Sequence, residues 1–311
     1  YVFWICGGME MIERFAYYGV RNNVALYATA PVSAGGLGIT ATQLGDIFLV
    51  WALVQTWVPV VTGGLSDRFG YKETIFAATL FKIAGYVVMA VFVSYWGFMI
   101  GAILVAFGTA IFKPGIQGTI VKSTSRTNSS IAWGVFYQTV NIGGYFGTLI
   151  AIQMRQLSWD TMFYVNAGMI MLNLILLMVY KEPEKEERLA RRAKIKSGEI
   201  VEPSLWKEAI NEFKRPILIY YMILFSGFWF MVYSFFDVLP LHIRDWVDTS
   251  AIITTLFGPE GTQNPVAHFM MGLTDDGKAI NPAGLFNLNA FIIMLSCFAI
   301  AGVSARMKAV N

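Results

Sequence analysis

The sequence predicts an all-α membrane protein with about eight transmembrane helices. Of the 311 residues, 56% are hydrophobic and only 14% are charged, whereas a soluble domain has about 25% charged residues. The apolar residues are gathered in eight runs, each near the roughly 20 residues with which an α-helix crosses a bilayer. The net charge of +3 is too small to indicate a nucleic-acid partner.

The first six runs predict one helical bundle, which occupies residues 1–180. They cover approximately residues 1–30, 41–65, 73–95, 97–121, 131–153 and 161–180. The second run is expected to begin with a capping box, because Gln43 follows Thr40 by three residues. A Gly-rich loop at 31–39 and a tight turn at 63–72 separate the first three runs.

The remaining sequence predicts a linker and the start of a second bundle. Residues 181–215 mix Lys and Arg with Glu and predict a cytoplasmic amphipathic linker. Residues 216–311 contain two apolar runs, 216–243 and 283–305, on either side of a long polar loop at 244–282. This layout is typical of a transporter with two six-helix bundles and a substrate site between them. Four more spans would complete the second bundle, so we expect its rest to be absent from this chain.

The basic residues orient the predicted helices. The loops that follow spans 2, 4 and 6, together with the C-terminal tail, contain sixteen Lys and Arg, whereas the opposite loops contain three. Because cytoplasmic loops are enriched in Lys and Arg, we expect the first set in the cytoplasm and residues 244–282 outside. The pattern predicts a multi-pass protein of the plasma or inner membrane, surrounded by the lipid bilayer.

The first run carries four charges in an otherwise apolar helix. They belong to Glu10, Glu13, Arg14 and Arg21. An ionised group at mid-membrane costs roughly 2.5–3.5 kcal/mol on insertion scales, so such groups remain where they pair or face a wet cavity. Glu10 and Arg14 stand four residues apart, in the order that favours an ion pair, and Tyr17 shares their face. We interpret the cluster as a functional site; the alternative is that its charges only neutralise each other.

Two lysines stand within later runs. Lys113 lies beside the helix-kinking Pro114 and needs an acidic partner in lipid. The carboxylates at similar depth in the first bundle are those of the first run, so we expect the lysine to pair there. Lys82 is an additional charge in the middle of the third run, and it could extend to the membrane surface, reach Asp46 or take part in transport.

The sequence lacks the residue patterns of an enzyme. His242 and His268 are isolated, and no nucleophile or metal-ligand constellation stands in the apolar runs. Cys6 and Cys297 lie in runs far apart in the sequence and are interpreted as packing residues. We therefore expect no catalytic residue, no metal site and no cofactor.

The turn at residues 63–72 resembles a known signature. Its sequence GGLSDRFGYK is similar to the G-x-x-x-D-R-x-G-R-[KR] motif between helices 2 and 3 of the major facilitator superfamily, with Tyr71 in place of the usual Arg. The resemblance implies a gating loop at the cytoplasmic side, formed by Gly64, Asp67 and Arg68. The alternative is a turn with a surface ion pair.

Three further motifs resemble the proton-dependent oligopeptide transporter family within that superfamily. Residues 10–19 match every defined position of the first-helix signature E-x-x-E-R-F-x-Y-Y-G. Residues 112–116 are similar to the F-K-P-N-I motif of helix 4, and residues 136–143 to the F-Y-x-x-I-N-x-G motif of helix 5. The motifs occur in the family's order and spacing over most of residues 1–150.

This resemblance implies a fold, a function and roles for individual residues. It implies a major facilitator fold that transports di- and tripeptides together with protons by alternating access. The proton-coupling and salt-bridge residues would be Glu10, Glu13, Arg14 and Lys113, and the residues that meet the substrate would be Arg21, Tyr17, Tyr18 and Asn141. The implied partner is a small-molecule substrate, a peptide, with protons as the coupling ion, and the protein is expected to be a monomer.

The sequence departs from the family pattern in helices 2 and 7. Tyr233 occupies the place where the family carries a Glu in helix 7, and Asp237 one turn later either replaces that acid or marks the outer helix end. Trp57 stands at a helix 2 position that is often Tyr. Tyr233 and Trp57 are expected to line the substrate cavity.

Two other functions stay open on the sequence. The first bundle sets three cations against two carboxylates, which favours a carrier of other small anionic solutes without standard proton coupling. A membrane receptor that keeps the fold but transports nothing is the second alternative.

Overall fold

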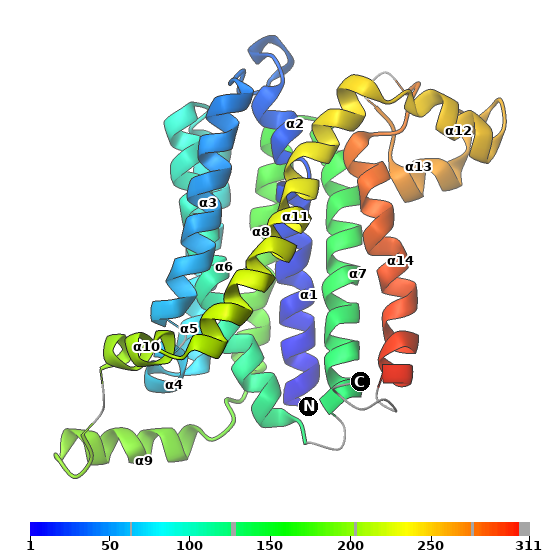
Figure 1. Cartoon of the computed structure of the whole chain (residues 1–311). Coiled ribbons are helices and arrows are strands. Elements are labelled where there is room, and N and C mark those ends of the chain that lie inside the picture. The colour runs from blue at the N-terminus through cyan, green and yellow to red at the C-terminus, as the bar shows by residue number, and fades with distance from the viewer. Residues whose placement is uncertain (63, 126–128, 202–203, 275–276, 305–311) are drawn as a thin grey trace.

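Helices make up the regular structure of this protein. The computed structural model describes residues 1–62, 64–125, 129–201, 204–274 and 277–304. In this part of the chain the one extended element is an isolated antiparallel bridge between Leu273 and Ile280. The long helices stand side by side along one axis (Figure 1). The predicted all-α class is confirmed.

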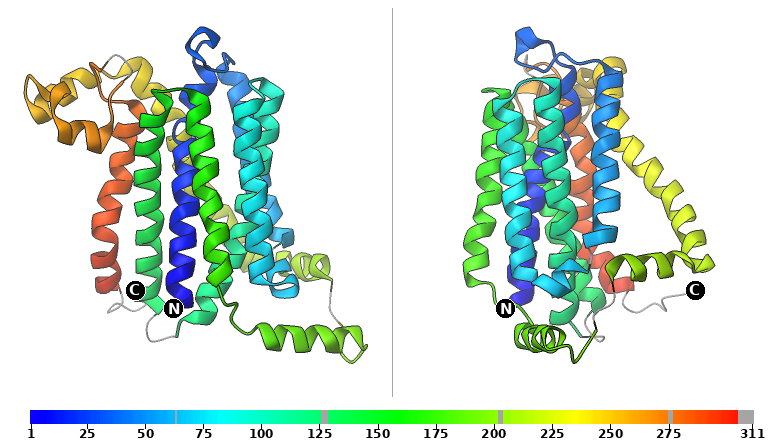
Figure 2. Two further views of the ribbon diagram at one scale, coloured as in Figure 1. Left: turned by 180° about the vertical axis from the view of Figure 1, so that it is seen from behind. Right: turned by 90° about the vertical axis from the view of Figure 1, so that its left-hand side faces the viewer.

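Eight long helices correspond to the eight predicted spans. They are α1 (Val2–Arg21), α3 (Ala41–Thr62), α5 (Tyr71–Val91), α6 (Tyr95–Ser123), α7 (Ser129–Arg155), α8 (Trp159–Val179), α11 (Pro216–Trp246) and α14 (Pro282–Ser304). By length and composition, six of the helices in the described residues can cross a membrane, namely α3, α5, α6, α8, α11 and α14. The more polar α1 and α7 run alongside them (Figures 1 and 2).

The first predicted span is divided in the structure. Helix α1 ends at Arg21, and the short helix α2 (Val24–Thr29) continues in nearly the same direction (Figure 1). The side chain of Asn23 donates to the carbonyl of Gly19 at 2.9 Å, and that of Asn22 donates to Thr148 on α7 at 2.9 Å. Asn side chains compete with the backbone for such bonds, which explains why the helix is interrupted there.

Helix α3 begins as the sequence predicts. The amide N–H of Gln43 donates to the hydroxyl of Thr40 at 3.2 Å, and the amide N–H of Thr40 donates to the side-chain oxygen of Gln43 at 3.0 Å. These reciprocal bonds satisfy two N–H groups that otherwise lack partners at a helix start. The capping box is confirmed.

Gly143, the last residue of the predicted helix 5 motif, and Gly147, one turn later, bring α7 against α1. A Cβ atom at Gly143 would overlap the carbonyl of Met11, and one at Gly147 would overlap that of Phe15. The two backbones can therefore approach closely only because these positions carry no side chain. This contact fixes the charged segment of α1 against the rest of the bundle.

We expect Gly143→Ala to lower the stability of the folded protein by about 1–3 kcal/mol, because overpacking forces backbone shifts. Thermal unfolding of the purified variant in detergent would measure the effect. Gly168→Ala on α8 is the matched control, since a Cβ there meets nothing within 4 Å. Equal unfolding temperatures for both variants would contradict the close packing of α1 and α7.

The first bundle has two apolar clusters, and a charged segment of α1 lies between them. One cluster includes Tyr27, Phe98 and Phe163, which pack near the end of the bundle where α2 lies. The other includes Met9 and Phe112, further along toward the opposite ends. Helix α1 passes through both clusters, and its residues 10–14 lie between them.

Residues 244–282 form more structure than a polar loop. They include α12 (Thr249–Phe257), the 3₁₀ turn η2 (Gly261–Gln263) and α13 (Pro265–Met271). These helices share a small apolar core with buried Ile253, Ala267 and Met271. They lie beside the ends of α7 and α14 (Figure 1), where the Tyr145 hydroxyl donates to the Met270 carbonyl at 3.3 Å. Residues 275–276 lie outside the described part of the chain.

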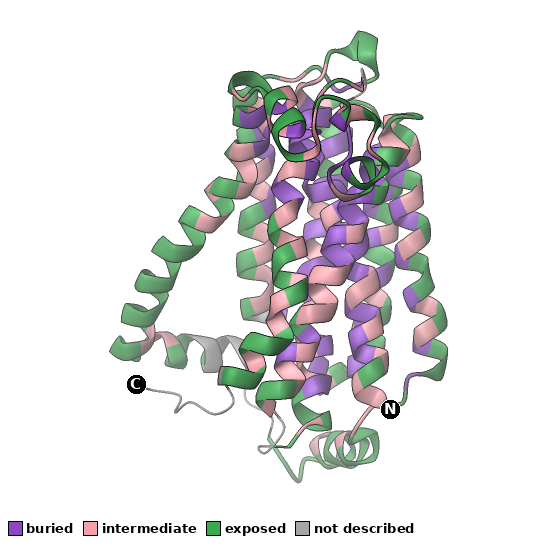
Figure 3. Cartoon of the chain, turned by 90° about the vertical axis from the view of Figure 1, so that its right-hand side faces the viewer, coloured by how far each residue is buried: buried purple, intermediate pink, exposed green. Residues whose placement is uncertain are grey.

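Helices α11 and α14 meet the first bundle in different ways. Helix α14 packs along α7: Asn287 donates to the carbonyl of Tyr145 at 2.8 Å, and Gln138 donates to that of Met294 at 3.2 Å. Helix α11 leans away from the other helices toward its N-terminal end (Figures 2 and 3). The side chains of α11 are therefore mostly exposed in this structure.

The linker lies across the end of the bundle where the N-terminus is found (Figure 1). It includes α9 (Lys185–Lys196) and α10 (Leu205–Phe213). The short helix α4 (Leu65–Phe69) lies at the same end. Residues 202–203 lie outside the described residues. The division of the chain at residues 180 and 215 stays a prediction.

Candidate functional site

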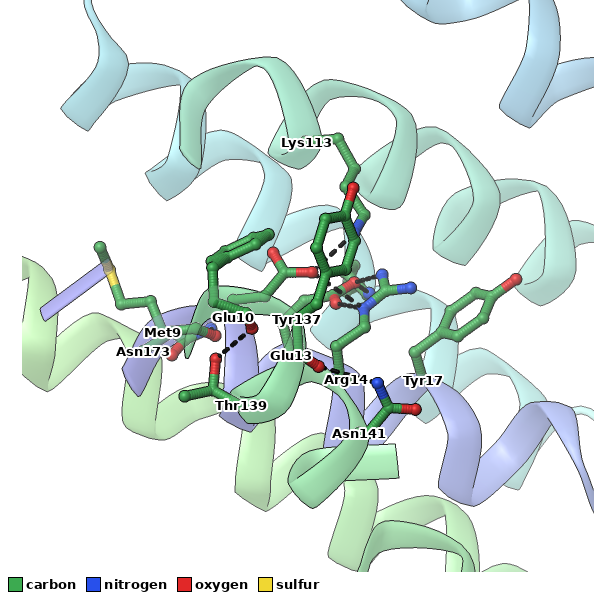
Figure 4. Close-up of polar contacts among 12 residues, drawn as sticks. Met9, Glu10, Glu13, Arg14, Tyr17, Lys113, Tyr137, Thr139, Asn141 and Asn173 are labelled. Carbon is green, nitrogen blue, oxygen red and sulfur yellow. Dashed lines mark hydrogen bonds and ion pairs between the residues drawn. The ribbon is translucent and has the colours of Figure 1, made fainter. Parts of the chain in front are cut away.

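The charged residues of α1 are buried together in the middle of the first bundle. Glu10 and Glu13 are 0% exposed, and Arg14 is 5% exposed. Their side chains converge with that of Lys113 from α6 (Figure 4). The structure therefore brings together all four residues that the sequence predicts as the proton-coupling and salt-bridge group.

Glu13 is held by two cations. The guanidinium of Arg14 donates to both carboxylate oxygens, with 2.6 Å between Nη2 and Oε1. The ammonium of Lys82, on α5, donates to the same Oε1. Charge-assisted bonds of this kind are roughly twice as strong as neutral ones, and a two-pronged Arg contact also fixes the geometry.

Glu10 is held less completely. The ammonium of Lys113 donates to its Oε1 at 2.6 Å, and the Arg14 Nε lies 3.4 Å from the same atom. The second oxygen, Oε2, is buried and has no hydrogen-bond partner among the described residues. Lys113 itself is 29% exposed, whereas Glu10 is fully buried. The Glu10 carboxylate therefore has an unused acceptor, and its lysine partner faces accessible space.

The position of Lys82 differs from two of the sequence-based alternatives. Its side chain is 0% exposed and pairs with Glu13, so it neither extends to the membrane surface nor reaches Asp46. Spacing within one helix cannot reveal a contact between α1 and α5. The one sequence signal was the lysine itself, because a cation in the middle of an apolar span requires a partner.

Aromatic rings surround the cations of this cluster. The Tyr17 ring lies 4.5 Å from the Arg14 guanidinium carbon and 5.3 Å from the Lys82 nitrogen. Such contacts stabilise a desolvated cation through the negative face of the ring. The Tyr17 hydroxyl pairs with the side chain of Gln55 on α3 at 3.2 Å. Sequence analysis missed Gln55, which no motif contains.

A cavity of about 210 Å³ adjoins the cluster. It is bounded by side chains of α1, α3, α6 and α11, namely Arg14, Tyr17, Tyr18, Arg21, Gln55, Pro59, Thr109, Ala110, Lys113, Trp229, Val232, Tyr233 and Phe236. Three of these are cations and none is a carboxylate. The cavity is thus lined by four of the residues predicted to meet the substrate, namely Tyr17, Tyr18, Arg21 and Tyr233. Glu10 and Glu13 lie behind its wall.

Two predicted substrate residues do not line this cavity. Trp57 is 59% exposed and lines neither this cavity nor the larger one between α3 and α11. It stands two residues after Gln55, and a helix turns by about 100° per residue, so its side chain points elsewhere; the expectation for Trp57 is wrong in this structure. Asn141 is also absent from the lining, and its amide donates to the carbonyl of Tyr137 at 2.8 Å (Figure 4).

An ion pair joins the two parts of the chain at the C-terminal end of α1. Arg21 donates to Asp237 on α11, and its guanidinium carbon also lies 4.2 Å from the ring centre of Phe48. Both ionic partners line a second cavity of about 1140 Å³ between α3 and α11. This cavity shares Arg21, Gln55, Trp229 and Tyr233 with the smaller one. Asp237 therefore faces α1 within the cavity instead of only marking a helix end.

The predicted gating loop is bound to the linker. Tyr71, which replaces the motif's Arg, donates its hydroxyl to the exposed Asp67. Arg188 on α9 donates to the carbonyl of Phe69 at 2.9 Å, and Glu182 accepts from the Tyr71 amide at 2.9 Å. Gly64 and Arg68 lie in the same turn, and Gly63 lies outside the described residues. The turn is therefore fixed to the linker by hydrogen bonds, and its role in gating stays a prediction.

No cluster for metal binding occurs in the residues that the structure describes. There, no three His, Cys, Asp or Glu side chains are placed to hold a metal ion. Cys6 is buried and Cys297 is partly buried, and both are free thiols. The polar chemistry of the described bundle is therefore that of carboxylates, cations and phenols.

Comparison with known proteins agrees with this architecture. The family model of the Major Facilitator Superfamily matches residues 4–309. The uncharacterized transporter YclF of Bacillus subtilis is 29% identical over 152 residues, which are 47% of this chain and 30% of that protein. The di-/tripeptide transporter of Lactococcus lactis subsp. cremoris is 27% identical over 146 residues, 45% of this chain and 29% of that protein. The chain thus spans about a third of these relatives.

Solved structures show the same fold. A crystal structure of the peptide transporter POT in complex with sulfate matches 99% of this chain and 69% of its own, with a TM-score of 0.60 and 17% identity. A bacterial homologue of the human drug peptide transporters matches 97% of this chain and 70% of its own, with a TM-score of 0.69 and 18% identity. The resemblance indicated by the motifs is confirmed, and the chain belongs to the Major Facilitator Superfamily of membrane transporters.

Proposed function

We propose that this protein is a secondary active transporter that carries di- and tripeptides together with protons by alternating access. The observation that carries the proposal is the buried Glu10–Lys113 pair. One partner is a fully buried acid with an unused oxygen, and the other lies on the wall of a cavity. A proton at the acid would release the lysine to the cavity, so that proton binding and substrate binding are linked.

The two cavities supply the groups that a peptide requires. Arg21 and Lys113 offer cations for the terminal carboxylate of a peptide. Asp237 lies on the larger cavity and offers a carboxylate for its terminal amine. Aromatic side chains such as Trp229 and Tyr233 supply the apolar walls that a binding site for varied side chains needs. A peptide that binds Arg21 or Asp237 would weaken the ion pair between these two residues. The helices α1 and α11, which the pair joins, could then separate.

A carrier of other small anionic solutes is the second candidate. The smaller cavity has three cations and no carboxylate in its lining, and Tyr233 occupies the place of the helix 7 acid in the family pattern. A site of this charge would favour a simple anion over a zwitterion. A membrane receptor without transport stays the third alternative, and uptake measurements separate it from both carriers.

Uptake into proteoliposomes tests the proposal. The full-length protein is reconstituted, and accumulation of labelled dialanine is followed with an inward proton gradient and without one. Accumulation that requires the gradient and is inhibited by other dipeptides supports the peptide carrier. Inhibition by simple organic acids but not by dipeptides supports the anion carrier. Binding without uptake supports the receptor.

The proposal includes an orientation and an oligomeric state. We propose that the end of the bundle with α4, α9 and the N-terminus faces the cytoplasm, in the plasma or inner membrane. Among the residues used for this orientation, Arg126, Arg306 and Lys308 lie outside the described part of the chain. We further propose a monomer in the lipid bilayer that uses protons as its coupling ion and no other cofactor.

A further inference from the structure

Lys82 occupies a position to which no motif assigns a role. It stands in the middle of α5, where it is the one charged residue after the first turn, with 0% of its side chain exposed. Its ammonium donates to Glu13 and lies 5.3 Å from the Tyr17 ring. Among the described residues, Glu13 is the one anion with which it forms an ion pair. Because an unpaired buried charge is strongly disfavoured, Lys82 depends on Glu13 staying ionised.

The packing of α5 against α6 holds Lys82 in place. A Cβ atom at Gly108 on α6 would lie 2.5 Å from Cγ of Lys82 and 2.8 Å from the carbonyl oxygen of Ala78. The missing side chain at Gly108 thus provides the space that the lysine stem fills. The ammonium is consequently presented to α1 from a tightly packed pair of helices.

The two carboxylates differ in how fully they are bound. Both oxygens of Glu13 accept bonds, from Arg14 and from Lys82, and these cations are themselves buried. Glu10 has one oxygen bound and one without a partner in the described part of the chain. A proton on Glu13 would leave Arg14 and Lys82 facing a neutral acid. A proton on Glu10 would weaken its pair with Lys113 and its 3.4 Å contact with Arg14. Arg14 stays bound to Glu13, whereas Lys113 becomes free to interact with the cavity.

We propose that Lys82 is a positioning residue that keeps Glu13 ionised, so that Glu10 is the carboxylate of this cluster that binds and releases the transported proton. The proton comes from water and binds Oε2 of Glu10, while Lys82, Lys113 and Arg14 keep their own protons. With both acids ionised the cluster has three cations and two anions, so its net charge is +1. Protonation of Glu10 raises the net charge to +2, which favours entry of an anionic group.

The neighbouring groups on each packed helix are consistent with this assignment. Titratable or charged groups near the two acids are Cys6, Arg14 and Tyr17 on α1, Lys82 and Tyr86 on α5, Lys113 on α6 and Tyr137 on α7. From α8 the contact is the neutral Asn173, whose amide donates to the Met9 carbonyl at 3.1 Å. The cations are thus concentrated on the α5 and α6 side, with Lys82 on Glu13 and Lys113 on Glu10.

The proposal deepens the proton coupling proposed above, and its test does not depend on transport. Infrared difference spectra of the purified full-length protein, recorded between neutral and acidic pH, detect the carbonyl stretch that a carboxylate gains when it is protonated. We expect the wild type to gain such a band, Glu10→Gln to lose it, and Glu13→Gln to retain it. In Lys82→Met we expect an additional band, which Lys82→Met combined with Glu13→Gln removes.

Three results would overturn the proposal. The first is a wild-type band that disappears in Glu13→Gln and persists in Glu10→Gln, and the second is the absence of any band in the folded wild type. The third is a Lys82→Met spectrum identical to that of the wild type, which would show that the lysine has no influence on Glu13. Lys122→Met is the matched control, because Lys122 is partly exposed near the end of α6 and pairs with Glu184.

A charge-conserving variant covers the case in which Lys82→Met does not fold. Lys82→Met with Glu13→Gln removes one cation and one anion, and it keeps the cluster at a net charge of +1. We expect this double variant to fold and to show the Glu10 band, and its absence would contradict the proposal. Dialanine uptake is measured separately: a Glu10 band without uptake removes the proposed function and leaves the role of Lys82 intact.

Discussion

Lys113→Ala is expected to abolish gradient-driven accumulation of substrate while leaving the protein folded. Without the lysine, Glu10 keeps only the 3.4 Å contact with Arg14, and removing one partner of a buried ion pair costs roughly 3–5 kcal/mol. In the variant no cation remains that a proton at Glu10 could release to the cavity. The proton gradient can therefore no longer be coupled to uptake, although exchange of internal for external substrate does not require that step.

Two assays in proteoliposomes separate these effects. Gradient-driven accumulation of labelled dialanine should fall to the level of empty vesicles, and exchange at equal pH on both sides should persist. Lys122→Ala on the same helix is the control, since its pair with Glu184 is at the surface, with side chains 32% and 45% exposed, and surface pairs contribute about 0–1 kcal/mol. Normal accumulation by Lys113→Ala would remove the basis of the proposed coupling.

Exchanging the charges of Arg21 and Asp237 is expected to preserve the contact between α1 and α11 but to abolish substrate uptake. This pair joins α1 to α11, and its side chains are 9% and 25% exposed. Hydrogen bonds to charged groups contribute about 1.5–3 kcal/mol, so Asp237→Arg or Arg21→Asp alone should shift the balance toward separated helices by roughly tenfold to a hundredfold. The double exchange should restore the contact.

Spectroscopic distance measurement between labels on α1 and α11, together with uptake, tests this prediction. We expect the doubly exchanged protein to regain the wild-type distance distribution but not dialanine uptake, because the guanidinium would then stand on the wrong helix for the substrate carboxylate. Asp245→Asn serves as the control, since that acid pairs with its neighbour Arg244 at the helix end. Full uptake by the double exchange would show that Arg21 acts only in closure.

Patterns within one helix predicted most of the fold. The eight runs became eight long helices, and the capping box at Thr40 and Gln43 formed as expected. The break after Arg21 was missed, because two Asn residues inside an apolar run do not reveal where their side chains will donate. The core in residues 244–282 was missed because short helices there alternate with turns and give no long periodic signal.

The site was predictable where a motif or a lone charge pointed to it. Lys113 required an acid, and the carboxylates of the first run were at a suitable depth, so a contact with α1 followed from charge. The choice of Glu10 between the two acids came from the family resemblance. Gln55, and Lys82 as the partner of Glu13, depend on how α3 and α5 pack against α1, which no spacing along the sequence specifies. The prediction that Trp57 lines the cavity was not met for a related reason, because a position along a helix does not determine which neighbour its side chain faces.

The ion pairs of α1 also bear on how the protein is assembled in the membrane. By composition, α1 is not among the described helices that can cross a bilayer unaided. The lysines that neutralise its acids follow 69 and 103 residues later in the chain. During synthesis α1 therefore leaves the ribosome well before α5 and α6 can supply those charges. We expect α1 to stay at the insertion machinery or the membrane surface and to integrate together with these later helices.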